Sequence, residues 1–227
     1  MTKPLSIERS LRSLAVARVH VLPADITNEV AVNGPFAKAT ADFGPLDVVV
    51  NNAAFLPAVS ALKDATLADW WRGFEVNILG TAIVTQAFLK TKPAGRKGVA
   101  ININTSVAHY GVFPTYSSYT SSKMAALRMT ECLPAEHPDD VRFLSLQPGG
   151  VDTDMYAKLH MPDHYPMTDI DLRSDTSVWL ASDEANFLAG RFMWTNWGAE
   201  ELIQRKEIII IEKELQSMLK PTERDLF

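Results

Sequence analysis

Cysteine is nearly absent from the sequence, whose 227 residues include a single one, Cys132. One thiol cannot form a disulfide within the chain, so nothing in the sequence indicates an oxidising compartment. Cys132 lies in a stretch of helical period, where we expect a small core side chain rather than a nucleophile.

The sequence also lacks long apolar runs and basic clusters. Its longest apolar runs, such as residues 46–50 and 208–211, are much too short to span a bilayer. No basic segment followed by an apolar stretch begins the sequence, so we expect no secretory signal. The net charge is −5, and no basic patch argues for nucleic acid. We therefore expect a cytoplasmic protein that binds neither membrane nor nucleic acid.

Hydrophobic residues make up 47% of the sequence, which suits one domain over residues 1–227. Short apolar runs alternate with stretches of helical period, a pattern typical of a parallel sheet with helices on both faces. The expected strands are residues 18–22, 46–51, 98–104, 141–147 and 191–195. The expected helices are residues 28–43 with a break at 33–35, 66–89 after a capping box at Thr66 and Asp69, 115–132 ended by Pro134, 174–185, and a tail at 200–227. Residues 152–171 lack periodicity and predict a long loop or short helices.

Tyr119 and Lys123 are a candidate catalytic pair. They lie one helical turn apart, so their side chains share a face. An ammonium group fixed beside a phenol favours the phenolate and lowers its pKa from about 10. Tyr119 would then serve as an acid or base near neutral pH. Such pairs also occur by chance on solvated helices, so the spacing alone does not establish a site.

Other polar residues occur where a binding site is expected. Asn51, Ser106 and Pro148 each end or follow an expected strand. The carboxyl ends of parallel strands line the crevice in which ligands bind. Asn77 lies inside an expected helix, where asparagine is unfavourable and needs a specific role.

Six motifs occur in one order along the chain. They are Asp25-Ile26-Thr27, Asn51-Asn52-Ala53-Ala54, the mid-helix Asn77, Ser106, Tyr119-x-x-x-Lys123 and Pro148-Gly149-x-Val151-x-Thr153. In order and approximate spacing, over residues 18–197, the set resembles the short-chain dehydrogenase/reductase family. The resemblance implies an α/β fold, a Rossmann-like doubly wound parallel sheet, with NAD or NADP as the cofactor.

The resemblance also implies a role for each residue. Tyr119 would be the general acid in carbonyl reduction and the base in alcohol oxidation, with Lys123 lowering its pKa and holding the nicotinamide ribose. Ser106 would orient the substrate carbonyl and stabilise the developing oxyanion. Asn77 would hold a water that links Lys123 to solvent. The dinucleotide would be contacted by Tyr119, Lys123, Asp25, Ile26, Asn51, Ala53, Pro148, Val151 and Thr153.

One element of the family is missing. Members normally begin with a strand and a Thr-Gly-x-x-x-Gly-x-Gly turn, whose glycines let the backbone approach the pyrophosphate. No such turn precedes Asp25. We therefore expect a sheet lacking the usual first two strands, with residues 1–17 as a residual helix and unpaired edges on the neighbouring strands. The residue that selects NAD or NADP lies in the missing segment, so the preference stays open. Residues 190–197 resemble the ending of fungal members.

The expected function is NAD(P)-dependent interconversion of a carbonyl and an alcohol on a small organic substrate. Family members are commonly dimers or tetramers built on the helix that carries Tyr119 and Lys123. Three explanations of the missing turn stay open. The chain is an incomplete translation of a longer enzyme, a shortened protein whose sheet closes differently or is completed by a partner, or a non-redox protein such as a partner-binding pseudoenzyme or a cofactor-independent isomerase.

Two other chemistries fit the sequence less well. Ser106, His109 and Asp152 include the residue types of a hydrolase triad, but no Gly-x-Ser-x-Gly turn surrounds Ser106. His160 and His164 are potential metal ligands, but lone histidines in a polar loop are more often solvated. We expect neither a hydrolase nor a metal site.

Overall fold

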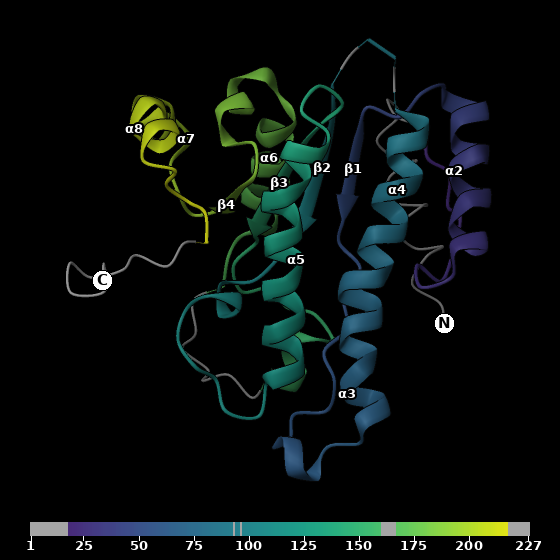
Figure 1. Cartoon of the computed structure of the whole chain (residues 1–227), viewed down its shortest axis with the longest axis vertical. Coiled ribbons are helices and arrows are strands. Elements are labelled where there is room, and N and C mark those ends of the chain that lie inside the picture. The colour runs from purple at the N-terminus through teal and green to yellow at the C-terminus, as the bar shows by residue number, and fades with distance from the viewer. Residues whose placement is uncertain (1–17, 93, 96, 160–166, 218–227) are drawn as a thin grey trace, which may run out of the picture.

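The computed structural model describes residues 18–92, 94–95, 97–159 and 167–217. These residues contain one parallel sheet in the order β1-β2-β3-β4. The strands are β1 (Val48–Asn51), β2 (Gly98–Ile103), β3 (Val141–Gln147) and β4 (Arg191–Trp194). Helices lie on both faces of the sheet (Figure 1), which confirms the predicted α/β class. None of the described helices has the length and apolar composition that a bilayer span requires.

The first face of the sheet is covered by helices from the first two thirds of the chain. They are α2 (Glu29–Phe43), α3 (Leu67–Phe74), the π-helical segment η2 (Glu75–Gly80), α4 (Thr81–Thr91) and α5 (Ser117–Glu136). Phe88 from α4 packs on Ala100 and Phe143 of the sheet, with Phe36 of α2 beside them. Phe88 and Phe143 are fully buried, and each such side chain stabilises the fold by about 2–3 kcal/mol.

The second face is covered by the C-terminal helices. They are α6 (Ile170–Ala181), the 3₁₀ helix η5 (Asp183–Leu188), α7 (Ala199–Gln204) and α8 (Lys206–Ile211). Ile101 of β2 and Leu144 of β3 join Leu180, Leu188 and Ile209 in this core. Ile101 and its neighbour in sequence, Ala100, therefore face opposite cores, as the period of a strand buried on both faces requires.

The strand predicted over residues 18–22 is wrong. This segment forms no ladder with any described strand and lies along α2, where Arg18 Nη2 donates to the carbonyl oxygen of Asp42 at 3.1 Å. His20 Nδ1 lies 2.9 Å from Asp42 Oδ2. A strand needs a neighbour for its N–H and C=O groups, and none of the described strands lies beside these residues. Residues 18–22 have the apolar pattern of a strand, but no described strand lies beside them to pair with.

Strand β1 is the edge of the described sheet. It pairs with β2 from Val48↔Val99 to Asn51↔Asn102 and with no other described strand. Val48 and Val50 point to the face opposite α4 and are 42% and 46% exposed. Two valines at a sheet edge are an apolar surface that a soluble chain usually covers.

The predicted break in α2 is also wrong, since the helix continues through Pro35. Proline removes one N–H donor and crowds the preceding turn. Here the helix start is fixed by Asn28, whose Oδ1 accepts from the N–H of Ala31 at 3.1 Å. Beyond the proline, Phe36 packs against the core. Because both halves are held, the lost hydrogen bond does not end the helix.

Helix α5 likewise continues past the residue expected to end it. Pro134 lies inside the helix, and the N–H of His137 still donates to the carbonyl oxygen of Leu133 at 2.9 Å, which closes the last turn. Cys132 is exposed on this turn and is not a core residue. The expectation of a buried thiol is therefore wrong.

Three other boundaries differ in detail. The helix predicted over residues 66–89 is confirmed as the continuous run α3–η2–α4. The predicted capping box is wrong: the Thr66 side chain makes no capping bond, and Asp69 Oδ2 accepts from the N–H of Ala58 at 2.8 Å. Helix α6 begins at Ile170 rather than at residue 174, and the side chain of Asp169 caps its first turn. The loop after β3 includes η4 (Tyr156–Leu159), and shorter 3₁₀ turns are η1 (Leu62–Asp64) and η3 (Ser106–Ala108). The expected helix at residues 1–17 and the end of the tail at 218–227 lie outside the described residues.

Candidate active site

The four predicted catalytic residues come from three elements near the carboxyl end of β2. Ser106 opens η3 just after β2, Asn77 lies within η2, and Tyr119 and Lys123 lie on α5. Helix α5 packs along β3 and against η2 and η3. The fold therefore brings together residues that the sequence separates.

Lys123 is fixed between its helix and the sheet. Its side chain is 4% exposed, and its Nζ donates to the carbonyl oxygen of Ile103, the last residue of β2, at 2.9 Å. The same Nζ lies 6.0 Å from the centre of the Tyr119 ring. The predicted shared face of α5 is thus present, with the ammonium directed to a strand end rather than to the phenol.

Burial dominates the protonation of this pair. It lowers the pKa of Lys123 to about 8 and raises the pKa of Tyr119 to about 12. The prediction that Lys123 lowers the phenol pKa is wrong for this geometry. The reason is that a buried site disfavours the charged form of both groups, and the Lys123 ammonium is bonded to Ile103. Tyr119 is therefore a protonated phenol, ready to donate.

Asn77 is buried and uses its whole side-chain amide. Nδ2 donates to the carbonyl oxygen of Phe55 at 3.0 Å and to Ser122 Oγ at 2.9 Å, while Oδ1 accepts from the N–H of Phe55 at 2.8 Å. These bonds join the loop after β1, which contains Phe55, to helix α5 at Ser122, the residue before Lys123. The extra residue of the π-helical turn places this amide, a use of π-bulges that is common at functional sites. The water relay expected at Asn77 stays a prediction.

Ser106 has a partner that sequence reasoning missed. Gln147, the last residue of β3, directs its Nε2 toward Ser106 Oγ at 3.5 Å. A serine oxygen that accepts this bond keeps its own proton for another acceptor. The signal in the sequence was a polar residue at the carboxyl end of an expected strand, directly before Pro148.

The predicted dinucleotide residues divide into two groups. Asn51 uses its side-chain amide nitrogen inside the protein, where Nδ2 donates to Asn102 Oδ1 at 2.6 Å and to Thr85 Oγ1 at 3.2 Å. Ala53 and Thr153 are exposed, and Pro148 and Val151 are half-buried. These four residues lie in the loops that follow β1 and β3, at the carboxyl edge where a ligand is expected.

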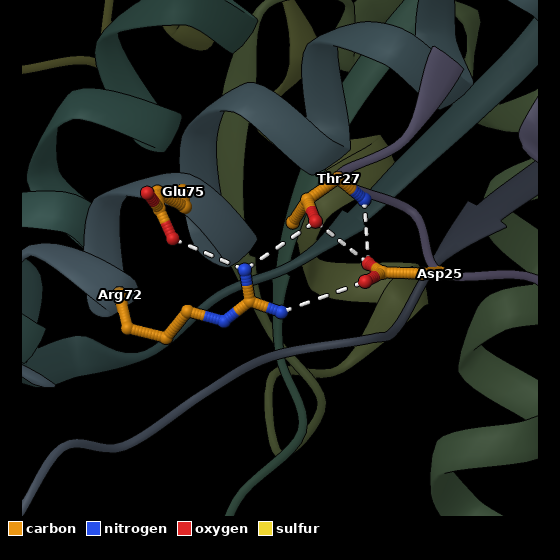
Figure 2. A network of polar contacts seen from close by, with 4 residues as sticks. All are labelled: Asp25, Thr27, Arg72 and Glu75. Carbon is orange, nitrogen blue, oxygen red and sulfur yellow. Dashed lines mark hydrogen bonds and ion pairs between the residues drawn. The ribbon is translucent and has the colours of Figure 1, made fainter. Parts of the chain in front are cut away.

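Asp25, Ile26 and Thr27 form a tight turn against η2. Figure 2 shows the Asp25 carboxylate closing the turn: Oδ1 accepts from the N–H of Thr27 at 2.9 Å and from its hydroxyl at 2.7 Å. These bonds, and the nearby Arg72 guanidinium, hold the pKa of Asp25 below its ordinary value. The side chain of Ile26 packs on Gly80, where an added Cβ would lie 2.6 Å from the Ile26 Cδ1. The turn is thus built on the helix that contains Asn77.

The hydrolase alternative finds no support in the geometry. His109 packs edge-on against Phe192, with ring centres 4.5 Å apart, and the hydrogen-bond partner found for Ser106 Oγ is Gln147. No group of three metal-ligating side chains occurs within the described residues. His160 and His164 lie outside those residues.

Comparison with known proteins identifies the family of the chain. Residues 3–163 match the model of the short chain dehydrogenase family. The chain belongs to the short-chain dehydrogenase family. The Monascus purpureus short chain dehydrogenase mpl6 is 34% identical over 191 residues, which are 83% of this chain and 65% of that protein. The Aspergillus terreus short chain dehydrogenase tazN is 31% identical over 217 residues, 91% of this chain and 48% of that protein. The chain thus spans about half to two thirds of the length of these curated relatives.

Solved structures of short-chain dehydrogenases share the fold. A short chain dehydrogenase from Burkholderia cenocepacia J2315, solved in complex with NADP, superposes with a TM-score of 0.75 at 23% identity, covering 86% of this chain and 82% of that one. A 7α-hydroxysteroid dehydrogenase complexed with NADH and 7-oxo glycochenodeoxycholic acid gives a TM-score of 0.76 at 20% identity, covering 84% and 77%. At these identities the similarity establishes the Rossmann-like architecture.

Proposed function

We propose that the protein is an NAD(P)-dependent oxidoreductase that interconverts a carbonyl and an alcohol on a small organic molecule. The observation that carries the proposal is the placement of Tyr119 and Lys123, one helical turn apart, with the Lys123 ammonium anchored on the carboxyl end of β2. Ser106 follows the same strand. Membership of the short-chain dehydrogenase family supports this reading of the constellation.

The residues present fit a nicotinamide dinucleotide. Lys123 is buried and, among the described residues, is bonded to a single carbonyl, so its remaining ammonium hydrogens suit ribose hydroxyl groups. Asp25 and Ile26 would contact the adenine, while Asn51, Ala53, Pro148, Val151 and Thr153 would contact the rest of the dinucleotide. The bound nicotinamide would supply or accept the hydride.

In reduction, Tyr119 donates its phenolic proton to the carbonyl oxygen of the substrate. A phenol with a pKa of about 12 is fully protonated at neutral pH, so the proton is available. Ser106 donates its hydroxyl proton to the same oxygen and stabilises the charge that develops there. Proton transfer leaves Tyr119 as a phenolate that takes up a proton from solvent, and alcohol oxidation uses the same groups in reverse.

The proposed substrate is a moderately apolar carbonyl compound or alcohol. The hollow beside Tyr119 is lined mainly by apolar side chains, including Leu56, Val59, Trp70 and Tyr116. A carbonyl compound at the edge of this hollow would turn its apolar part toward these side chains and its oxygen toward Tyr119.

The test of the function is carbonyl reduction by the purified chain with NADPH and with NADH, followed by loss of nicotinamide absorbance. Tyr119→Phe should lower kcat at least about a thousandfold, because it removes the proton donor, while dinucleotide binding is retained. Tyr110→Phe is the matched control, since this residue is 70% exposed. Turnover that survives Tyr119→Phe, or that needs no dinucleotide, would show a non-redox protein instead.

We also propose that two or four copies associate through α5. A groove of about 580 Å³ runs along the exposed side of this helix and includes Val112, Phe113 and Met124. Val112 is 94% exposed, which is unusual for an isolated valine and suits an interface. Light scattering after size exclusion should give a dimer or tetramer, and Met124→Lys should give a monomer. A monomeric parent chain would contradict the proposal.

A further inference from the structure

Helix α8 contains a run of four isoleucines, Ile208–Ile211, and the core uses only one of them. Ile209 is 1% exposed and belongs to the core on the second face of the sheet. Ile208, Ile210 and Ile211 are 52%, 50% and 73% exposed. Because successive residues of a helix are about 100° apart, Ile211 points away from the core, with Ile208 and Ile210 on either side of it. The outer half of the helix is therefore apolar.

Neither helix formation nor core packing explains this apolar face. Isoleucine is a weaker helix former than alanine, glutamine or lysine, so local propensity does not favour it here. Single exposed apolar side chains are ordinary, but exposed isoleucines side by side are a surface that a soluble chain usually covers. Figure 1 shows α7 and α8 at the β4 end of the sheet, at the opposite side of the molecule from α2. This surface is also separate from the groove along α5, which no residue of α8 lines.

The charges around the isoleucines have a symmetric order. Arg205 Nη2 and Glu214 Oε2 lie 2.9 Å apart, so these two charges neutralise each other within the chain. The remaining four charges of the segment are exposed and form no ion pair within the described residues: Lys206 and Glu207 before the isoleucines, Glu212 and Lys213 after them. The sequence of residues 206–213, Lys-Glu-Ile-Ile-Ile-Ile-Glu-Lys, thus reads the same in both directions. The rim of the apolar face is neutral and holds two charges of each sign.

We propose that the outer face of α8 binds the same face of a second copy of the chain, with the two helices antiparallel. A two-fold contact uses one patch on both copies, so the patch must complement itself. In the antiparallel arrangement the start of one helix meets the end of the other, and Lys206 lies near Glu212 of the second copy while Glu207 lies near Lys213. A parallel arrangement would place like charges together and is disfavoured.

The same charges argue against a lipid surface as the occupant. Helices that lie in a membrane interface usually carry an excess of lysine and arginine on their polar face, which attracts anionic lipids. The rim of α8 has no such excess, and the helix is only six residues long. A second copy, with its own acidic and basic residues, is the partner that the rim complements.

The proposed contact is weak by itself. Three isoleucines from each copy are a small contact beside the roughly 800 Å² per partner that a stable interface buries. The association therefore depends strongly on concentration, and it joins whatever species forms through α5. It rests neither on the proposed activity nor on the α5 contact.

Sedimentation equilibrium of the intact chain tests the apolar part of the contact. At about 500 μM, which populates weak contacts, the parent should have about twice the average mass of Ile211→Gln. Val30→Gln is the matched control, because Val30 is 82% exposed on α2 and its replacement should leave the parent mass unchanged. Equal masses for the parent and Ile211→Gln, or an equal fall in Val30→Gln, would overturn the proposal.

Exchange of the charges tests the antiparallel arrangement. Lys206→Glu with Lys213→Glu gives an acidic rim, and Glu207→Lys with Glu212→Lys gives a basic one. Each double variant alone should have about half the parent mass at the same concentration, and an equimolar mixture should regain the parent mass. All four positions are exposed, so the thermal unfolding midpoints should stay close to that of the parent.

Three results of these experiments would contradict the proposal. The first is a parent mass in both double variants, and the second is a mixture that does not regain it. The third is cosedimentation of the parent with phosphatidylserine-containing vesicles that is lost in Ile211→Gln, which would assign the face to a membrane. None of these measurements involves a carbonyl compound or a dinucleotide, so their failure is distinct from failure of the proposed activity.

Discussion

Gln147 Nε2 lies 3.5 Å from Ser106 Oγ, so the amide at the end of β3 donates to the hydroxyl that follows β2. The bond leaves the serine proton to point elsewhere, and in the proposed reaction it points at the substrate oxygen. Gln147 therefore acts through Ser106 and is a positioning residue.

Gln147→Leu should lower kcat by about fivefold to tenfold with little change in KM, because a neutral hydrogen bond that orients a catalytic group is worth about 1 kcal/mol. Gln147→Glu should lower it further, since a carboxylate accepts the serine proton and takes it from the substrate. Gln204→Leu, at an exposed position of α7, is the control and should leave kcat unchanged. Equal activity of the parent chain and Gln147→Glu would contradict this role.

The sequence predicts the four described strands well and residues 18–22 badly. Four strands are recognisable because their apolar runs are a property of their own residues. Residues 18–22 have the same pattern, but a strand also needs a neighbour, and pairing is a property of the rest of the sheet. Pro35 and Pro134 failed as helix breakers for a related reason: packing and hydrogen bonds on both sides hold the helices.

The candidate site divides in the same way. Tyr119 and Lys123 are predictable from local spacing, and Ser106 from its place after a strand. Gln147 and Arg72 are not, because their partners Ser106 and Thr27 lie 41 and 45 residues away in sequence. The protonation of the pair was predicted with the wrong sign, since spacing on a helix reveals the neighbouring charge but not the depth of burial.

The pH dependence of stability should report the burial of Lys123. Its pKa falls from 10.5 in the unfolded chain to about 8 in the folded one. Between these values the unfolded chain binds a proton that the folded chain has released, so raising the pH favours the folded chain. The cost of burying the Lys123 ammonium is absent above the unfolded pKa of 10.5, and it applies in full as pH falls through the folded pKa of about 8. The free energy of unfolding should rise by about 2 kcal/mol from pH 8 to pH 10.

Denaturant titrations at these two pH values check this. Lys123→Met should abolish the rise, and Lys90→Met, at an exposed position of α4, should keep it. Above pH 10 the sign reverses, because Tyr119 has a folded pKa of about 12 and its contribution is present below the unfolded value of 10 and lost above it. Tyr119→Phe should remove that decline. A Lys123→Met chain with the pH slope of its parent would contradict the assignment.

Asn77 should be the side chain whose removal most disturbs the link between η2 and α5. Asn77→Ala leaves the N–H and carbonyl of Phe55 and the hydroxyl of Ser122 without their partner in a buried site. The expected loss is about 3 kcal/mol of unfolding free energy. Asn33→Ala, at an exposed position within α2, should be neutral or slightly stabilising, because alanine is the better helix former. Similar denaturation midpoints for the two variants would show that the amide network contributes little.

Gly149, in the motif after β3, is required for two separate reasons. Its φ of +78° is a conformation that residues with a Cβ rarely adopt, and an added Cβ would collide with Thr168. The collision matters because Thr168 donates its N–H to the carbonyl oxygen of Gly150 at 2.9 Å, which holds the start of the α6 segment against the proposed cofactor loop.

Gly95 separates the two reasons, since it has a φ of +72° but open space around it. Gly95→Ala should cost about 1 kcal/mol from backbone strain alone. Gly149→Ala should cost more and should also weaken dinucleotide binding at least about tenfold, because either Thr168 or the Pro148–Val151 loop must move. Thermal unfolding and nucleotide titration of both variants give the comparison. If both lose the same stability and Gly149→Ala binds normally, the contact with Thr168 has no part in shaping the loop.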